Sequence, residues 1–197
     1  MARKGRSKAR ATLGVLLSFG MSALLFGCAG ANGSAADTRN EGLPVWETAF
    51  RDLFDDDIEP PVTSLMAGAT IARGDPLLRE RARTAEWVGR VRVSTVTVQS
   101  SGGRATYRIV VEAVAAPFIT PKISDTSWEF VVGPTARAYQ LTRAYENRLR
   151  ESQFIGFLRR FAGEGGEPEL HWHLSPDSAD VAIAVKDALG LAELSGT

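Results

Sequence analysis

The sequence predicts an α+β fold: a small antiparallel five-stranded sheet with two helices before it and one after it. Beyond Trp87, apolar residues alternate with polar ones, which is the period of a strand. The turn at residues 100–103 separates two such runs and predicts a hairpin. Outside this region, apolar residues recur every three or four positions, which is the period of a helix.

Two helices are expected before the sheet. The first covers residues 44–54, whose large apolar side chains share one face: Trp46, Phe50, Leu53 and Phe54. The second begins at Asp75 and Pro76, because aspartate caps a helix and proline suits its first turn. Between them, the acidic run Asp55–Glu59 lacks the alternating acids and the glycine of a calcium loop. We therefore interpret it as a solvated turn.

Five strands follow, with a helix between the third and the fourth. The strands are expected at 88–99, 104–115, 128–132, 153–161 and 170–174, and the helix at 135–150. In the first strand the alternation changes phase between Val93 and Val96, which predicts a β-bulge. A last helix begins after Ser175-Pro176 and ends at Gly190.

The order of these elements over residues 88–174 resembles the OB-fold, a five-stranded barrel whose helix lies between the third and fourth strands. The resemblance implies a long, kinked first strand that serves both sheets of the barrel, which fits the change of phase. The alternative is an open antiparallel sheet with helices on one face.

The first 27 residues have the composition of an export signal. Residues 1–10 carry five Lys and Arg and no acid, and residues 12–27 carry no charge. These 16 uncharged residues are fewer than the roughly 20 that a membrane-spanning helix needs. We therefore expect residues 1–27 to be a cleaved signal peptide.

The uncharged stretch ends at Cys28, the only cysteine in the chain. The sequence Leu25-Phe26-Gly27-Cys28 resembles the lipobox of bacterial lipoproteins, although Phe26 replaces the usual small residue. The resemblance implies a diacylglycerol on the Cys28 thiol, cleavage before Cys28 and acylation of its amino group. Many lipoproteins are retained at the inner membrane by an aspartate after the cysteine, and this chain has Ala29 there. We therefore expect the protein to be anchored in the outer membrane and to face the periplasm. Two alternatives are cleavage after Ala29-Gly30-Ala31, which releases a soluble periplasmic protein, and an uncleaved anchor.

Residues 28–42 are expected to form a lipidated tether, and residues 43–197 a single globular domain. From Cys28 onward the chain has 18 Lys and Arg against 23 Asp and Glu, a net charge of −5. This charge disfavours contacts with phosphates, so no nucleic-acid partner is expected. With Cys28 lipidated, no thiol remains for a disulfide, a nucleophile or a metal site.

His171 and His173 are the residues that most suggest chemistry. Alternate residues of a strand share a face, so the two imidazoles could hold a metal ion together. A catalytic zinc needs a third protein ligand, for which a carboxylate such as Glu129 would have to serve. The competing interpretation buries Trp172 between Leu170 and Leu174 and turns both histidines to water.

Three classes of function follow from these observations. The first is a non-catalytic envelope module that binds another envelope protein or a cell-wall glycan. The second is a small-ligand carrier or the binding lipoprotein of an importer. The third is a zinc-dependent hydrolase that uses His171 and His173. Because the chain contains no phosphate-binding loop, nucleophile elbow or H-E-x-x-H motif, we expect the first class, with no cofactor.

Overall fold

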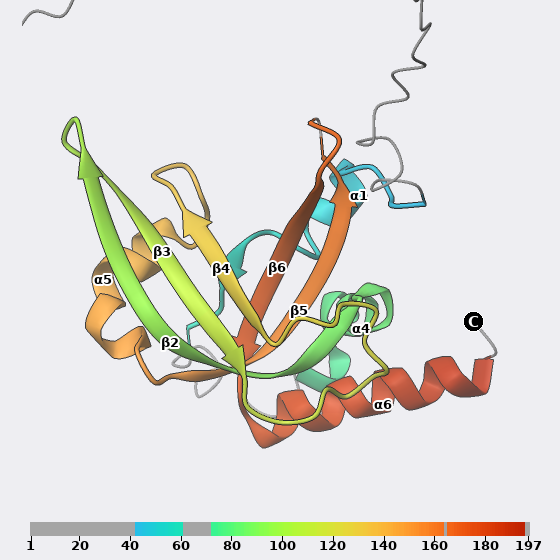
Figure 1. The fold of residues 1–197 in the computed structure, drawn as a ribbon. Helices are drawn as coiled ribbons and strands as arrows, with labels where there is room; N and C mark the ends of the chain where they lie inside the picture. The colour runs from blue at the N-terminus through green and yellow to red at the C-terminus, as the bar shows by residue number, and fades with distance from the viewer. Residues whose placement is uncertain (1–41, 61–71, 164, 196–197) are drawn as a thin grey trace, which may run out of the picture. The chain divides into compact units, whose positions relative to one another are not determined.

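A computed structural model of the protein shows the predicted helices and strands in order, with one additional short strand between the first two helices (Figure 1). In chain order they are α1 (Thr48–Arg51), β1 (Asp57–Ile58), α4 (Pro76–Thr84), β2 (Trp87–Ser101), β3 (Arg104–Ala113), β4 (Ser127–Val132), α5 (Tyr139–Leu149), β5 (Gln153–Ala162), β6 (Pro168–Pro176) and α6 (Ala179–Ser195). The α+β class is therefore confirmed.

The structure describes residues 42–60, 72–163 and 165–195, and side chains as far as residue 190. These residues belong to one compact unit that spans Ser34–Thr197. The predicted signal peptide (1–27), Cys28 and the tether up to residue 41 lie outside the described residues and stay predictions. Among the helices of the described chain, none combines the length and apolarity required to cross a bilayer.

The strands form one six-stranded sheet in the order β1-β6-β5-β2-β3-β4. Neighbouring strands are antiparallel except β1, which pairs in parallel with β6. The prediction of five antiparallel strands was wrong in this respect, and the sheet is mixed. Strand β1 consists of two residues of the acidic run, which is too short to show an alternating pattern.

The predicted bulge lies in β2, where the register with β3 shifts between Val93 and Thr95. The extra residue returns Val96 to the face that Val91 and Val93 occupy, and all three are buried in one cluster. Strand β2 pairs with β5 through its first part and with β3 through the rest, so it connects the two halves of the sheet.

The sheet curls strongly (Figure 1). Phe130 of β4 stacks on Trp172 of β6 with ring centroids 4.3 Å apart, although three strands separate β4 from β6 in the strand order. The face that carries both rings is therefore the concave face of a half-barrel. Its side chains, together with Leu149 of α5, form an inner core of buried residues.

The convex face carries an outer core, covered by α4, α6 and the segment of residues 44–59. We call this segment the strap. Phe54 of the strap is buried in the outer core, whereas Ile58 is buried in the inner core. The strap therefore passes around the edge of β6 from one face of the sheet to the other.

Two helices differ from their predicted bounds. Helix α1 covers four residues rather than residues 44–54, because Val45 instead forms a parallel bridge with Ala162 of β5. Helix α6 starts at Ala179, where the side chain of Ser178 accepts a hydrogen bond from the Val181 amide, and it continues past Gly190. The start of α4 is as predicted, with the Asp75 carboxylate accepting from an amide of the first turn.

Candidate functional site

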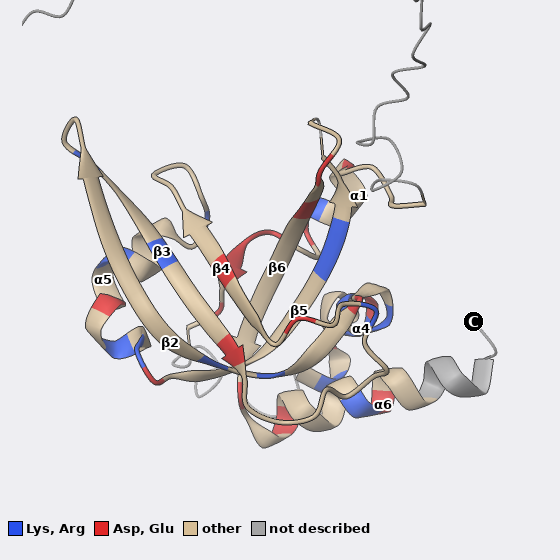
Figure 2. Ribbon diagram, in the orientation of Figure 1, with Lys and Arg blue, Asp and Glu red and all other residues tan. Residues whose placement is uncertain are grey.

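The candidate site lies where the acidic end of the strap meets the edge of β6. The Asp56 amide donates to the carbonyl of Trp172 at 2.9 Å, and the Glu59 amide donates to the carbonyl of Leu174 at 2.8 Å. Between these two bonds lies β1, the short teal arrow of Figure 1, and the acidic residues of this segment are red in Figure 2. The backbone therefore holds the acidic run at a fixed register against the two histidines.

His173 lies between two carboxylates of the strap. Its Nδ1 is hydrogen-bonded to Oδ1 of Asp55 at 2.7 Å, and its Nε2 lies 3.2 Å from Oε1 of Glu59. The side chain of His173 is 3% exposed and that of Asp55 is 9% exposed, whereas Glu59 is 41% exposed. The pair with Asp55 is thus protected from water, and the pair with Glu59 is partly solvated.

His171 makes a second, more superficial pair one step along β6. Its Nδ1 lies 2.8 Å from Oδ2 of Asp56, and its ring stacks on Trp46 with centroids 3.6 Å apart and planes 3° apart. The other oxygen of Asp56 accepts from the backbone amide of Trp172 at 3.1 Å. Both ends of the strap therefore contact the same histidine.

A buried arginine fixes the strap from the other side. Arg81 of α4 is 3% exposed, and its Nε donates to the carbonyl of Leu53 at 2.5 Å while Nη2 donates to that of Asp52 at 3.2 Å. An arginine stays charged in proteins, so its charge also acts on Asp55 and Glu59, although burial lowers the pKa of the guanidinium.

Burial and pairing act in opposite directions on the ionisable groups of the site. Burial disfavours charge on Asp55 and on Glu59, but the hydrogen bonding and charge of His173 hold the pKa of both carboxyls below their ordinary values. Burial also disfavours a charged His173, whereas its hydrogen bond with Asp55 and the nearby carboxylate of Glu59 raise its pKa. The site therefore favours a protonated imidazole between two carboxylates.

The predicted faces of β6 are correct, but the predicted exposure is not. Trp172 and Leu174 are buried in the inner core and Leu170 packs against it, as expected. The histidines were expected to face water, and this was wrong because the strap covers them. The acidic run was interpreted as a solvated turn, and this was also wrong, since it pairs with β6.

The proposed third zinc ligand lies elsewhere. Glu129 is on β4, where its carboxylate pairs with Arg108 of β3. Within residues 42–60, 72–163 and 165–190, no group of three or more His, Cys, Asp or Glu side chains is placed to hold a metal ion. The arrangement is suited instead to hold a proton and to fasten a strand.

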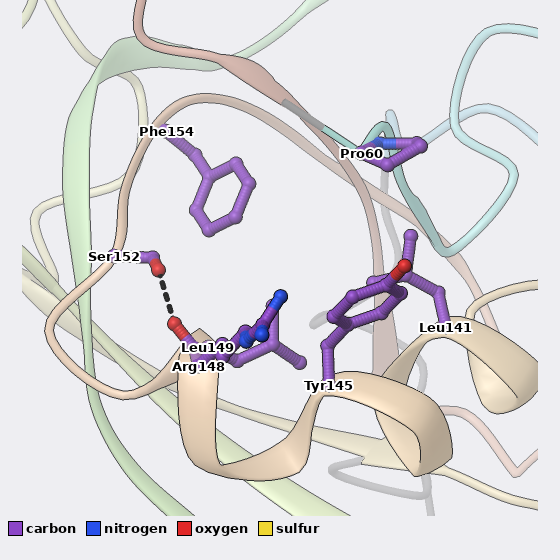
Figure 3. A pocket seen from close by; sticks show the side chains of 7 residues that line it. All are labelled: Pro60, Leu141, Tyr145, Arg148, Leu149, Ser152 and Phe154. Atoms are coloured by element: carbon purple, nitrogen blue, oxygen red, sulfur yellow. Dashed lines mark hydrogen bonds between the residues drawn. The ribbon is translucent and has the colours of Figure 1, made fainter. Parts of the chain in front are cut away.

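A cavity of about 170 Å³ lies between α5 and the start of β5 (Figure 3). Its lining consists of Pro60, Leu141, Tyr145, Arg148, Leu149, Ser152 and Phe154. Tyr145 is 43% exposed, and α5 is kinked at this residue. The volume is close to the roughly 150 Å³ of an engineered cavity that holds benzene, so one ring-sized apolar group would fit.

The spacing of the two histidines in the sequence points to them but not to their partners. Asp55, Asp56 and Glu59 come from a run that the absence of a calcium pattern removed from consideration. Arg81 was missed as well, because its partners, the carbonyls of Asp52 and Leu53, lie far from it in the sequence. Comparison with protein-family models, curated proteins and solved structures found no match for the chain.

Proposed function

We propose that this protein is an exported, lipid-anchored envelope protein that acts as a non-catalytic binding or structural module for another envelope protein or a cell-wall glycan. The observation that carries the proposal is the sequence Leu25-Phe26-Gly27-Cys28, which follows a basic head and an uncharged stretch. Two or more acyl chains anchor a protein stably, at roughly 0.8 kcal/mol per buried CH₂. The domain then faces the periplasm from the outer membrane.

The geometry of the histidines supports binding rather than hydrolysis. The His173 ring lies between two carboxylates, so metal ligation at Nε2 would have to displace its contact with the partly exposed carboxylate of Glu59. The Nε2 atom of His171 has no hydrogen-bond partner among the described residues, and the nearest carboxylate oxygen of Glu169 is 3.9 Å away. This leaves a zinc hydrolase as the less supported alternative.

The pairing of the strands also supports the proposal of a binding module. We take the fold to be an opened relative of the OB barrel, because β2 pairs with both β3 and β5, as the first strand of that barrel does. OB barrels bind oligosaccharides and oligonucleotides along the sheet. The net charge of −5 favours the former.

One observation favours a small-ligand carrier as the second candidate. The cavity under α5 has mostly apolar walls, with Arg148 and Tyr145 at its rim and the guanidinium 5.9 Å from the ring. A ligand that occupies it should raise the melting temperature in proportion to the logarithm of its concentration. A screen of ring-sized apolar acids tests this candidate directly.

Metabolic labelling tests the anchor. Cells given a labelled fatty acid should label the wild-type protein, and Cys28→Ser should abolish the label. Label that persists in Cys28→Ser, or that is missing from both proteins, contradicts the proposal. Cross-linking in intact cells, followed by identification of the co-purified molecules, then tests whether the domain binds an envelope partner.

A further inference from the structure

The edge of β6 binds the end of the strap as a peptide-binding strand edge binds a ligand. Backbone hydrogen bonds from Asp56 and Glu59 flank the pairing of β1 with β6, and the side chain of Ile58 is 1% exposed. Addition of an extended segment to a sheet edge is a common mode of peptide recognition, in which the backbone supplies affinity and side-chain pockets supply specificity. We call this edge the strand slot.

The strand slot is selective for acids. His173 contacts Asp55 and Glu59, and His171 contacts Asp56. Arg137, which follows β4, adds an ion pair with Asp55 at 3.3 Å and one with Asp52 at 3.7 Å. Two further cations face the strap: the charge of Arg81 acts on Asp55 and Glu59, and the Arg159 guanidinium lies 4.9 Å from the centroid of the Phe50 ring. A segment without acids would leave the histidines and Arg137 unpaired.

Among the described residues, the strap joins the sheet through the two residues of β1 and through the bridge of Val45 with Ala162, and β4 forms the opposite edge. We infer that the strand slot is a receptor for an extended acidic segment of a partner protein, and that the strap is its built-in competitor. This inference rests on the proposed function as a binding module. The pattern that fits the slot is two acids, any residue, a branched apolar residue and a further acid, as in residues 55–59.

A competitor that is part of the same chain lowers the apparent affinity for a partner by the fraction of time that the slot is open. Weakening the strap should therefore strengthen binding of a segment in trans. Weakening the slot should do the opposite. A purely structural strap predicts neither effect, because nothing else would enter the edge.

The test uses the purified mature chain and a fluorescent peptide with the sequence of residues 52–60, DLFDDDIEP. The double change Asp55→Ala, Glu59→Ala removes contacts of the strap and leaves the cations of the slot. By fluorescence anisotropy, this variant should bind the peptide at least tenfold more tightly than the wild type does. Adding His173→Gln should reverse the gain. The matched control peptide NLFNNNIQP, with every acid neutralised, should bind neither protein.

Several outcomes would overturn the inference. These are equal peptide affinity of wild type and strap variant, equal binding of the neutral peptide, and no binding to a strap variant that circular dichroism shows to be folded. If that variant does not fold, Asp56→Ala, which removes only the pair with His171 and one backbone contact, gives the same comparison. If the wild-type protein is a dimer and the peptide dissociates it, the slot binds the strap of a second copy. That result would overturn the inference that the slot binds a different protein.

The inference and the proposed function can fail separately. If the peptide does not bind but cross-linking captures an envelope partner that depends on acylated Cys28, the strand slot is wrong and the proposed function stands. If the peptide binds as expected but Cys28 carries no lipid, the anchor is wrong and the slot stands.

Discussion

The two faces of β6 are equally buried but have opposite chemistry. Trp172 on the concave face and His173 on the convex face are each 3% exposed. Trp172 is covered by other strands of the same sheet, whereas His173 is covered by the strap, whose Asp55 lies 118 positions earlier in the chain. Alternation of residue types therefore identifies the two faces of a strand. It does not tell which of them meets water.

The largest expected effect concerns the concave face. Trp172→Ala should lower the free energy of unfolding by roughly 3–5 kcal/mol, because a large aromatic side chain leaves a cavity in a packed core. Urea denaturation measures this loss. The control Val131→Ala, at a position 58% exposed on β4, should stay within about 0.5 kcal/mol. If Trp172→Ala lowers the free energy of unfolding by less than about 1 kcal/mol, truncation at the buried position is tolerated about as well as truncation at the exposed position of Val131. That result would contradict the prediction.

The convex face should be sensitive to a change of charge rather than of volume. His173→Ala should cost about 1–3 kcal/mol, because it leaves the buried carboxylate of Asp55 without its hydrogen-bond partner. The interpretation that turns both histidines to water would instead predict a nearly silent change. Adding Asp55→Ala should cost less than the sum of the single changes, since the partner is then removed as well.

An exposed ion pair supplies the matched control for this second prediction. Glu129 and Arg108 have side chains 47% and 40% exposed, so Glu129→Ala should change the free energy of unfolding by about 0–1 kcal/mol. If Glu129→Ala and His173→Ala cost the same, the strap does not shield the convex face.

The smallest expected effect is a dependence of stability on pH. It arises on the convex face of β6, because His173 and its carboxylate partners are ionisable, whereas Trp172 on the concave face is not. The pKa of His173 is raised above its ordinary 6.5, so its contribution is complete below pH 6.5 and declines as the pH rises through the folded value. Asp55 and Glu59, lowered from 3.8 and 4.5, contribute fully above pH 4.5 and lose their contribution as the pH falls through their folded pKa values. Burial raises the pKa of Asp57, so protonation of this residue favours the folded state. It therefore offsets part of the stability that is lost as the pH falls.

The urea midpoint should therefore be highest between pH 4.5 and 6.5 and lower on both sides. His173→Gln should remove the fall of the urea midpoint above pH 6.5. The fall of the midpoint at acid pH that comes from other carboxyl groups should remain. A wild-type midpoint that stays constant as the pH rises from 6.5 would show that His173 carries no extra proton in the folded state.

Much of the sheet could be predicted because its strands are long and alternate. Strands β2 and β3, their turn and even the bulge near Val93 follow from the order of β-branched and polar residues. The cap at Asp75 follows from local hydrogen bonding, which the neighbouring residues alone determine. Such features depend on short stretches of chain.

The strap could not be predicted, because it depends on distant partners. Helical spacing of Trp46, Phe50 and Phe54 correctly indicated one packed stripe, in which Phe54 is buried and the other two are partly buried. It overestimated the helix, since the same side chains pack on Phe161 around only one helical turn. The acidic run carries no periodic signal, so its pairing with β6 was missed. The histidines were noticed for their spacing, yet their environment comes from residues that are adjacent only after folding.

The course of the strap also determines how the domain would bear a mechanical load. A force that enters the described chain at residue 42 reaches first the bond between the Pro44 carbonyl and the Ala162 amide, then the stack of Trp46 on His171. The buried pair of Asp55 and His173 comes last. Contacts arranged in this way break one after another rather than together, so the domain should yield by peeling from its outermost contact inward, with the curled sheet still intact behind it.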